Sequence, residues 1–192
     1  MINSSIPIFL ASKSPRRRKL LKQLGLKFKS FSVEMDEIIR PYEKPSGTVL
    51  RLSIEKLNLA KEKIKNGIII TADTIVVLNK KVLGKPVNKK DAFRILKMLS
   101  DKTHIVYTGY SIFNSINKKT ISEYEKTKVT FRKLTDLEIL EYIEEGSPMD
   151  KACAYGIQDD FGAVFIKKID GCYYNVVGLP LAKLYHTLLR IL

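Results

Sequence analysis

The spacing of apolar and polar positions predicts alternating strands and helices along the chain. Short apolar runs predict strands over residues 6–11 and 28–33, and a longer run predicts a strand over 68–78, although Ala72-Asp73-Thr74 interrupts its apolar character. Apolar residues three and four positions apart predict amphipathic helices. These are expected over about 15–24, 47–65, 88–99 and 135–145, with a last one opening at Pro180. Further strands are expected over 104–113, 120–131 and 163–169, the first two around a turn at 114–119.

Capping and turn residues mark the ends of these elements. Ser14 is expected to cap the first helix, with Pro15 as its first residue and Gly25 as its stop. Ser46 is expected to cap the second helix, and residues 79–81 to form a turn. Strands that alternate with helices, followed by a hairpin of two long strands, predict an α/β architecture with a mixed sheet.

The composition is that of a globular protein, and the length suits one domain over residues 1–192. With 45% hydrophobic and 28% charged residues, the chain is too apolar to be disordered. Its apolar runs are far shorter than the roughly 20 residues that span a membrane, and its first residues do not match a signal peptide. Two distant cysteines and two histidines offer too few ligands for a zinc site. We therefore expect a cytoplasmic protein with reduced thiols and no membrane partner.

The formal net charge of +14 leaves three interpretations open. The lysines form a solvated surface, or they attract a small anionic substrate, or they bind a nucleic acid. They are spread along the whole chain rather than gathered in one tail, which speaks against a polymeric nucleic acid. The charge alone does not decide between an enzyme that acts on an anion and a protein with a basic surface.

The stretch LASKSPRRRKLL places three arginines and a lysine in the first turn of a predicted helix. That end of a helix is partly positive, so cations there are disfavoured unless an anion binds nearby. Ser12, Ser14 and the backbone N–H groups near Arg16 would form an anion site where strand and helix meet. Arg16 and Arg17 would grip phosphate oxygens with paired hydrogen bonds. The alternative is a solvated basic face without a ligand.

Three further residues carry chemistry that a fold alone does not require. Asp73 lies within an apolar strand, where a carboxylate is costly to bury unless it is paired with a cation or a metal. The alternative is that Asp73 caps a strand or forms part of a turn. Lys85, in GKP, lacks the flanking residues of a P-loop and is either a phosphate-binding cation or an exposed lysine. Gln158 either reads a base edge through its amide or lies on the surface. His104 and His186 are expected to be structural.

Seven segments resemble, in the same order, those of the Maf family of nucleoside triphosphate pyrophosphatases. They are LASKSPRRRKLL, RLSIEKLNLAK, ITADTIVVL, GKPV, HIVYTGY, DKACAYGIQ and NVVGLPLAKLY, and the match runs from about residue 8 to 189. The resemblance implies a fold similar to the inosine triphosphatase-like enzymes: an elongated mixed β-sheet flanked by helices, with two lobes and a central cleft. It also implies a homodimer.

The resemblance implies roles for individual residues as well. Asp73 resembles the catalytic proton acceptor, and Glu37 an acidic residue of the same cleft. The residues that resemble phosphate-binding positions are Ser12, Arg17, Lys56 and Lys85. The residues that resemble the dTTP- and UTP-specific branch of the family are Arg16, Thr74 and Gln158. One departure is Asp159, which stands where relatives usually carry a glycine beside the base-reading glutamine.

Together, the residues and the resemblance predict hydrolysis of dTTP and UTP to the nucleoside monophosphate and pyrophosphate. A polyphosphate substrate requires positive charge, which the arginines and lysines above supply. A divalent cation, Mg²⁺ or else Mn²⁺, is expected on Asp73 and Glu37, because Mg²⁺ takes one or two protein carboxylates together with substrate oxygens. Two alternatives stay open: house-cleaning of modified nucleotides, and a non-catalytic role in nucleic-acid binding or in the regulation of cell division.

Overall fold

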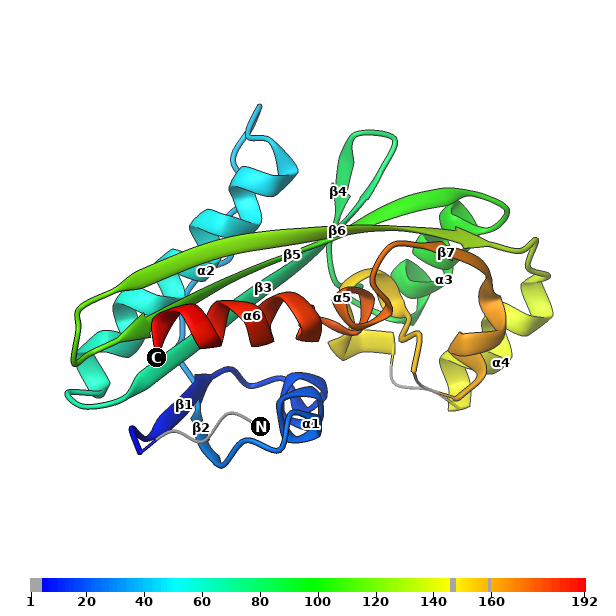
Figure 1. Cartoon of the computed structure of the whole chain (residues 1–192). Coiled ribbons are helices and arrows are strands. Elements are labelled where there is room, and N and C mark those ends of the chain that lie inside the picture. Colours follow the sequence, from blue (N-terminus) through cyan, green and yellow to red (C-terminus); the bar gives the residue numbers. More distant parts are fainter. Residues whose placement is uncertain (1–4, 146–147, 159) are drawn as a thin grey trace. The chain divides into compact units, whose positions relative to one another are not determined.

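The computed structural model describes residues 5–145, 148–158 and 160–192. Within these residues, the strands form a seven-stranded sheet in the order β2-β1-β3-β5-β6-β7, with β4 paired to β3. They are β1 Ile8–Ala11, β2 Phe28–Phe31, β3 Ile68–Leu78, β4 Lys81–Leu83, β5 Thr103–Asn114, β6 Thr120–Phe131 and β7 Ile166–Asp170. Strand β1 is parallel to β2 and β3, whereas β4 is antiparallel to β3 and β7 to β6. The predicted α/β class with a mixed sheet is confirmed (Figure 1).

Helices flank this sheet. They are α1 Pro15–Gln23, α2 Pro45–Lys63, α3 Lys89–Leu99, α4 Asp136–Glu145, α5 Tyr173–Val177 and α6 Leu181–Ile191, with 3₁₀ helices at Pro148–Asp150, Ala152–Ala154 and Asp160–Phe165. In the described part of the chain, none of the helices combines the length and the apolar character needed to cross a membrane.

The chain divides into two compact units. The first comprises the described residues up to Asp73 together with Thr108–Glu125 and Gly178–Leu192. The second comprises Thr74–Tyr107 and Lys126–Val177. Strands β3, β5 and β6 contribute residues to both units, so each unit is assembled from segments that are distant in sequence.

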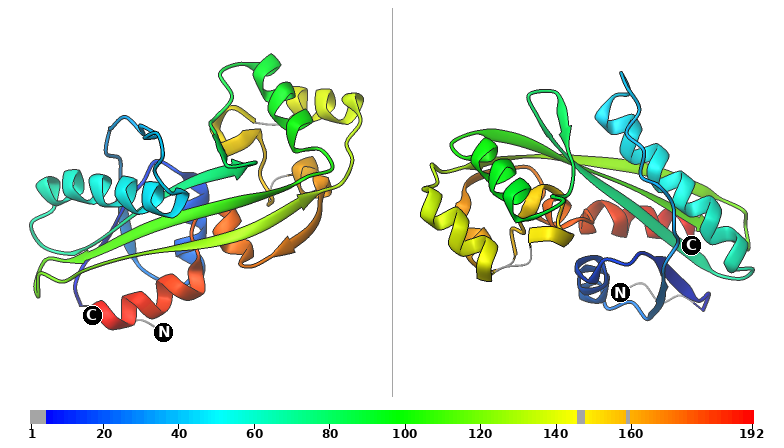
Figure 2. Two further views of the ribbon diagram at one scale, coloured as in Figure 1. Left: turned by 90° about the horizontal axis from the view of Figure 1, so that it is seen from above. Right: turned by 180° about the vertical axis from the view of Figure 1, so that it is seen from behind.

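In the first unit, helices α2 and α6 cover opposite faces of the long strands (Figure 2). Side chains along a strand alternate between its two faces, so neighbouring residues of β5 meet different helices. The hydroxyl oxygen of Ser111 lies 2.8 Å from that of Ser53 on α2. The hydroxyl oxygen of Tyr110 lies 2.9 Å from that of Thr187 on α6. These four polar side chains are buried and hydrogen-bonded, as is usual for buried polar groups.

The second unit has its own apolar core, to which helices α3 and α4 both contribute. The two helices pack against each other (Figure 1). Buried side chains of this core include Val76, Ile95, Leu96, Phe131, Ile139 and Phe165. They come from strands and helices alike, and burial of apolar surface at about 25 cal/mol per Å² is the main force that joins these elements.

Strand β3 has the bounds predicted from the sequence, Ile68–Leu78, and includes the polar residues that interrupt its apolar run. The strand tolerates the buried carboxylate of Asp73 because this group is paired with a lysine from another element. The turn is one residue shorter than the predicted 79–81, because Lys81 is the first residue of β4 and pairs with Leu78 of β3. Asn79 and Lys80 alone make this turn, with φ of 49° and 64°, as the tightest hairpin loops require.

Two further boundaries were predicted incorrectly. Helix α2 begins at Pro45 with Lys44 as its N-cap, so Ser46 is not the cap. Proline is favoured at the first helical position because its fixed φ suits the helix and its missing N–H would have no helical partner. Residues 160–165 form a 3₁₀ helix where a strand was expected from 163, and β7 begins only at Ile166. A short apolar run does not by itself distinguish a strand from a helical turn.

The buried histidine of the second unit has the structural role expected of it. His104 is fully buried, and its Nε2 lies 2.6 Å from the hydroxyl oxygen of Tyr155. Its ring also packs edge-to-face against Phe131 and Tyr155. Burial lowers the pKa of His104 from 6.5 to about 4. The folded protein therefore keeps this side chain uncharged at neutral pH.

This pKa difference predicts a loss of stability in mild acid. Below pH 6.5 the unfolded chain binds a proton at His104, whereas the folded protein does so only near pH 4, so stability falls as the pH falls through this window. Between pH 7 and pH 5 the loss is about 2 kcal/mol of unfolding free energy. His104→Gln is expected to abolish this part of the dependence in urea unfolding at both pH values. The exposed His186 provides the control, because His186→Gln should keep the wild-type slope. Equal slopes in the wild type and His104→Gln would contradict the prediction.

Candidate active site

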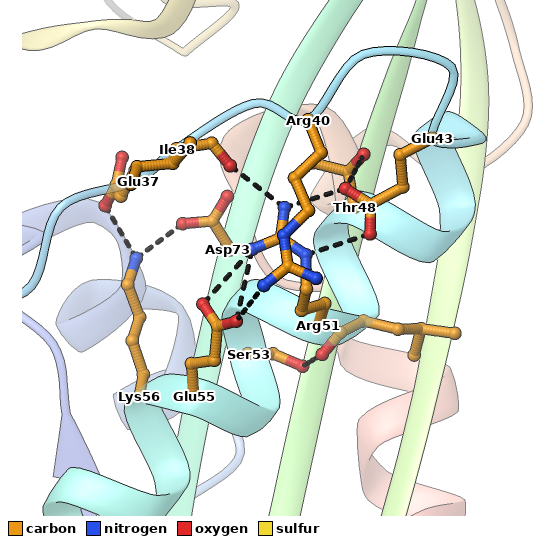
Figure 3. Close-up of polar contacts among 11 residues, drawn as sticks. Glu37, Ile38, Arg40, Glu43, Thr48, Arg51, Ser53, Glu55, Lys56 and Asp73 are labelled. Carbon is orange, nitrogen blue, oxygen red and sulfur yellow. Dashed lines mark hydrogen bonds and ion pairs between the residues drawn. The ribbon is translucent and has the colours of Figure 1, made fainter.

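A buried lysine of the first unit bridges two carboxylates (Figure 3). Lys56 of α2 donates from Nζ to Glu37 Oε1 at 2.7 Å and also to Asp73 Oδ1. Asp73 lies in β3 and is 3% exposed, and Lys56 is 9% exposed. Glu37 comes from the loop between β2 and α2, and its side chain is 45% exposed. We call these three residues the acid–lysine cluster; it has a buried end at Asp73 and an open end at Glu37.

The positions of Lys56 and Asp73 on their elements explain why they meet. Strand residues two apart share a face, and helix residues three apart share a side. Thr71 Oγ1 of β3 donates to the carbonyl oxygen of Ser53 on α2 at 2.7 Å, so these two surfaces are in contact. Two residues further along β3 and three further along α2 lie Asp73 and Lys56. Gly109 of β5 permits the close approach, because a Cβ there would lie 2.4 Å from a carbonyl oxygen of α2.

The charges around Asp73 act on its pKa in opposite directions. Burial raises the pKa above the ordinary value and is the largest influence. The cations Lys56 and Arg17 lower it, whereas the negative charge of Glu37 raises it. A buried carboxylate is costly to ionise without such cations. Asp73 is therefore more ready to accept a proton than an exposed aspartate.

The turn between β1 and α1 has the predicted helix start. Ser14 is the N-cap, its Oγ accepting from the backbone N–H of Arg17 at 3.4 Å, and Pro15 is the first helical residue. Ser12 Oγ accepts from the backbone N–H of Ser14 at 3.2 Å. Arg16 lies half-buried in the same turn. Within α1, all of which the structure describes, no acidic side chain lies in the first turn, so nothing from this helix neutralises its positive end.

Arg17 ties this turn to the strand that carries Asp73. Its Nε donates to the carbonyl oxygen of Gly178 at 2.9 Å, and its Nη1 to that of Ala72 at 2.8 Å and to Ser12 Oγ at 3.5 Å. Burial lowers the pKa of Arg17, and the negative charge of Asp73 opposes this shift. The structure thus brings Ser12 and Arg17 to the residue before Asp73. Nε and Nη1 donate to backbone carbonyl oxygens in this structure. These two atoms therefore do not make the paired contact with a phosphate that was expected of Arg17.

Three of the predicted site residues belong to the second unit. Thr74 follows Asp73 in β3 and is half-buried, and Lys85 follows β4 and is exposed. Gln158 lies in a turn, and its Oε1 and Nε2 are both buried with no hydrogen-bond partner among the described residues. Asp159, the departure from the family pattern, lies outside the described residues.

The buried amide of Gln158 is unusual, because buried polar atoms are nearly always hydrogen-bonded. In the same DKACAYGIQ segment, the backbone of Cys153 and Ala154 has φ of 59° and 63°. This left-handed conformation costs a non-glycine residue about 1 kcal/mol or more. Strained backbone and unpaired polar atoms concentrate at sites that bind ligands. Both features favour a ligand-reading role for Gln158 over that of a surface glutamine.

Asp73 and Glu37 match the donors that Mg²⁺ prefers. Their oxygens converge on one cation, the ammonium group of Lys56. Mg²⁺ usually takes one or two protein carboxylates and completes its shell with water and substrate oxygens. Among the described residues, no group of three or more His, Cys, Asp or Glu side chains would hold a metal on its own. The acid–lysine cluster therefore suits a hard divalent cation that arrives with phosphate oxygens.

One charged residue beside the cluster was not singled out from the sequence. Arg51 of α2 contacts the carboxylates of Glu43 and Glu55 and the carbonyl oxygen of Ile38. Its spacing of four residues from Glu55 is a recognisable sign of an ion pair on a helix surface. The contact with a backbone carbonyl has no sequence signature, so its link to the neighbouring Glu37 could be found only in the structure.

The chain is similar over nearly its whole length to proteins of one family. The family model described as Maf-like protein matches residues 7–191, which include both units. A dTTP/UTP pyrophosphatase of Syntrophomonas wolfei subsp. wolfei is 47% identical over 181 residues, which are 94% of this chain and 95% of that protein. Those of Carboxydothermus hydrogenoformans and Bacillus anthracis are 48% and 44% identical, over 94% of this chain and 96% and 93% of their own lengths. By these matches, the chain belongs to the Maf family.

Proposed function

We propose that this protein hydrolyses dTTP and UTP to the nucleoside monophosphate and pyrophosphate. The observation that carries the proposal is the acid–lysine cluster, whose buried end adjoins the turn of Ser12 and Arg17. Positive groups fixed in such a place stabilise the charge that builds up on a reacting phosphate. The name that the relatives carry, dTTP/UTP pyrophosphatase, supports the same reaction.

Asp73 is the proton acceptor in this proposal. As the oxygen of a water molecule bonds to the α-phosphorus, the bond from that phosphorus to the oxygen bridging to the β-phosphate breaks, and pyrophosphate leaves. The proton lost by the water passes to a carboxylate oxygen of Asp73. Its raised pKa suits this task, because a general base works best when its pKa lies nearer the working pH. Lys56, Lys85 and Arg16 are proposed to bind the phosphates.

A divalent cation is part of the proposal. Asp73 and Glu37 would hold Mg²⁺, or Mn²⁺ in its place. When bound, the ion would neutralise negative charge on the phosphate oxygens. We also propose a homodimer, a single domain and a cytoplasmic location, as inferred from the sequence. The family match, which includes residues of both units, supports the single domain.

Gln158, with Arg16 and Thr74, is proposed to select the base. Gln158→Ala is expected to narrow the preference for dTTP over dCTP about 5–30-fold in kcat/KM, because one or two hydrogen bonds of about 1 kcal/mol each are lost. The turnover of dTTP should fall less than this preference. Gln23→Ala, at an exposed position of α1, is the matched control and should change neither quantity. Equal losses on every nucleotide would make Gln158 a general structural residue instead.

Pyrophosphate release from a panel of canonical and modified nucleoside triphosphates, with and without Mg²⁺, tests the proposed function. Faster release from dTTP and UTP than from the other nucleotides is the expected result. Faster release from a modified nucleotide would point to house-cleaning instead. Undetectable release together with salt-sensitive binding to long DNA or RNA would replace the enzyme with a nucleic-acid-binding protein.

A further inference from the structure

Arg51 of α2 is the centre of a second charged cluster, next to the acid–lysine cluster (Figure 3). Its Nε and Nη2 donate to the two carboxylate oxygens of Glu43 at 2.9 and 2.7 Å. Its Nη1 lies 3.2 Å from both carboxylate oxygens of Glu55, and Nη2 also donates to the carbonyl oxygen of Ile38 at 2.9 Å. These five contacts equal in number the five N–H donors of a guanidinium group.

The partners of Arg51 join the loop of residues 32–44 to the helix that follows it. Ile38 lies in the middle of this loop and Glu43 at its end, whereas Glu55 lies one turn further along α2. The side chains of Arg51 and Glu43 are only 15% and 20% exposed, so water competes weakly for their hydrogen bonds. The hydrogen bond from Arg51 is also the main cause that lowers the pKa of Glu43. One side chain thus fastens the loop at two points.

The hydrogen bond from Arg51 to Ile38 has its largest effect on the position of Glu37, which precedes Ile38 in the loop. The Glu37 side chain is 45% exposed where it meets Lys56, so water screens this ion pair from one side. The contact also acts only at the tip of a side chain, which leaves the backbone of the loop free to move. A guanidinium bound to the next carbonyl group does restrain the backbone from which Glu37 projects. The geometry of the open end of the acid–lysine cluster therefore depends on Arg51.

We propose that Arg51 is a positioning residue for the pyrophosphatase reaction, which holds loop 32–44 so that Glu37 meets Lys56 and Asp73. This inference rests on the proposed function, since the position of Glu37 affects catalysis only if the cluster is the active site. Arginine is needed because its planar fork reaches two carboxylates and a carbonyl group at once, whereas lysine offers a single charged point. Partners that orient a metal-ligating residue, the role proposed above for Glu37, typically contribute about 10–100-fold in activity.

A double-mutant cycle between Arg51 and Glu37 tests the pathway of the effect. Arg51→Met is expected to lower kcat/KM for dTTP about 10–100-fold, and Arg51→Lys to retain only part of the lost activity. In a Glu37→Gln background, Arg51→Met should cost less than about 3-fold, because its effect passes through Glu37. Arg94→Met, which removes an exposed arginine paired with Asp91, is the control and should keep the wild-type rate. An equal cost of Arg51→Met in both backgrounds would overturn the proposal.

Amide hydrogen exchange of the intact protein tests the fastening without using activity. Arg51→Met is expected to speed exchange over residues 37–43 by about tenfold or more, while β3 and α6 keep their wild-type rates. Unchanged exchange in the loop, or faster exchange throughout the protein, would overturn the proposal. If the wild type releases no pyrophosphate but Arg51→Met still speeds exchange in the loop, the proposed function is refuted and, with it, the catalytic consequence of Arg51. If the wild type is active but Arg51→Met leaves exchange in the loop unchanged, the inference alone is refuted.

Discussion

Asp73→Asn is expected to lower kcat for dTTP hydrolysis about 10²–10⁴-fold without lowering the melting temperature. The rate falls because an amide cannot take up the proton that the carboxylate accepts from water. Stability is kept because burial raises the pKa of Asp73, so the folded protein favours the uncharged form, which asparagine imitates, more than the unfolded chain does. Since most changes to buried polar residues are destabilising, this combination of results identifies a residue retained for chemistry.

The sign of this stability effect follows from the pKa of Asp73. The folded protein binds the proton at a higher pH than the unfolded chain, so the stabilising effect of protonation is present at low pH and is lost as the pH rises through the folded pKa. Ionisation of Asp73 is therefore costly in the folded protein, and Asp73→Asn removes this cost. Calorimetry and pyrophosphate release measure the two quantities. Asp91→Asn, at a half-buried aspartate bonded to Arg94, is the matched control for the rate. A near-wild-type rate in Asp73→Asn would exclude Asp73 as the proton acceptor.

Most of the fold could be predicted because burial on one face leaves a periodic trace in the sequence. What could not be predicted depends on contacts between residues that are remote in sequence. The apolar run of β3 shows that Asp73 needs a partner, but it does not show that this partner is Lys56, 17 residues earlier in the chain. Nothing within the strand pattern itself carries that information.

The candidate site was less predictable from residue chemistry alone. Asp73 could be selected because a carboxylate in an apolar run requires an explanation. Lys56 and Glu37 were assigned through the family resemblance, since a lysine on a helix and a glutamate in a polar loop are ordinary surface residues by default. Burial of Lys56 depends on the contact between α2 and β3, which only the folded chain creates. The role of Arg51 is not predictable for the same reason, because it depends on a hydrogen bond to the backbone carbonyl group of Ile38 that only the folded chain makes.

Lys56→Met is expected to abolish dTTP hydrolysis and to lower the free energy of unfolding by about 3–5 kcal/mol at pH 7. Methionine is unbranched and flexible, so it can fill the space of the lysine stem. Without the ammonium group, Asp73 stays buried near the negative charge of Glu37, with Arg17 left to lower its pKa. Removing one partner of a buried ion pair is costly because the other charge remains out of water.

A second substitution and a change of pH distinguish this charge effect from a packing effect. In Lys56→Met the pKa of Asp73 rises further, so the stability difference between this variant and the wild type should shrink as the pH falls from 7 to 5. The loss of stability caused by His104 is common to both proteins and cancels in this difference. Adding Asp73→Asn should restore most of the stability but no hydrolysis. The exposed Lys63 on the same helix is the control, and Lys63→Met should change stability by less than about 0.5 kcal/mol in urea unfolding. A double variant as unstable as Lys56→Met would mean that methionine packs poorly between α2 and β3, and that the balance of charge is not the cause of the lost stability.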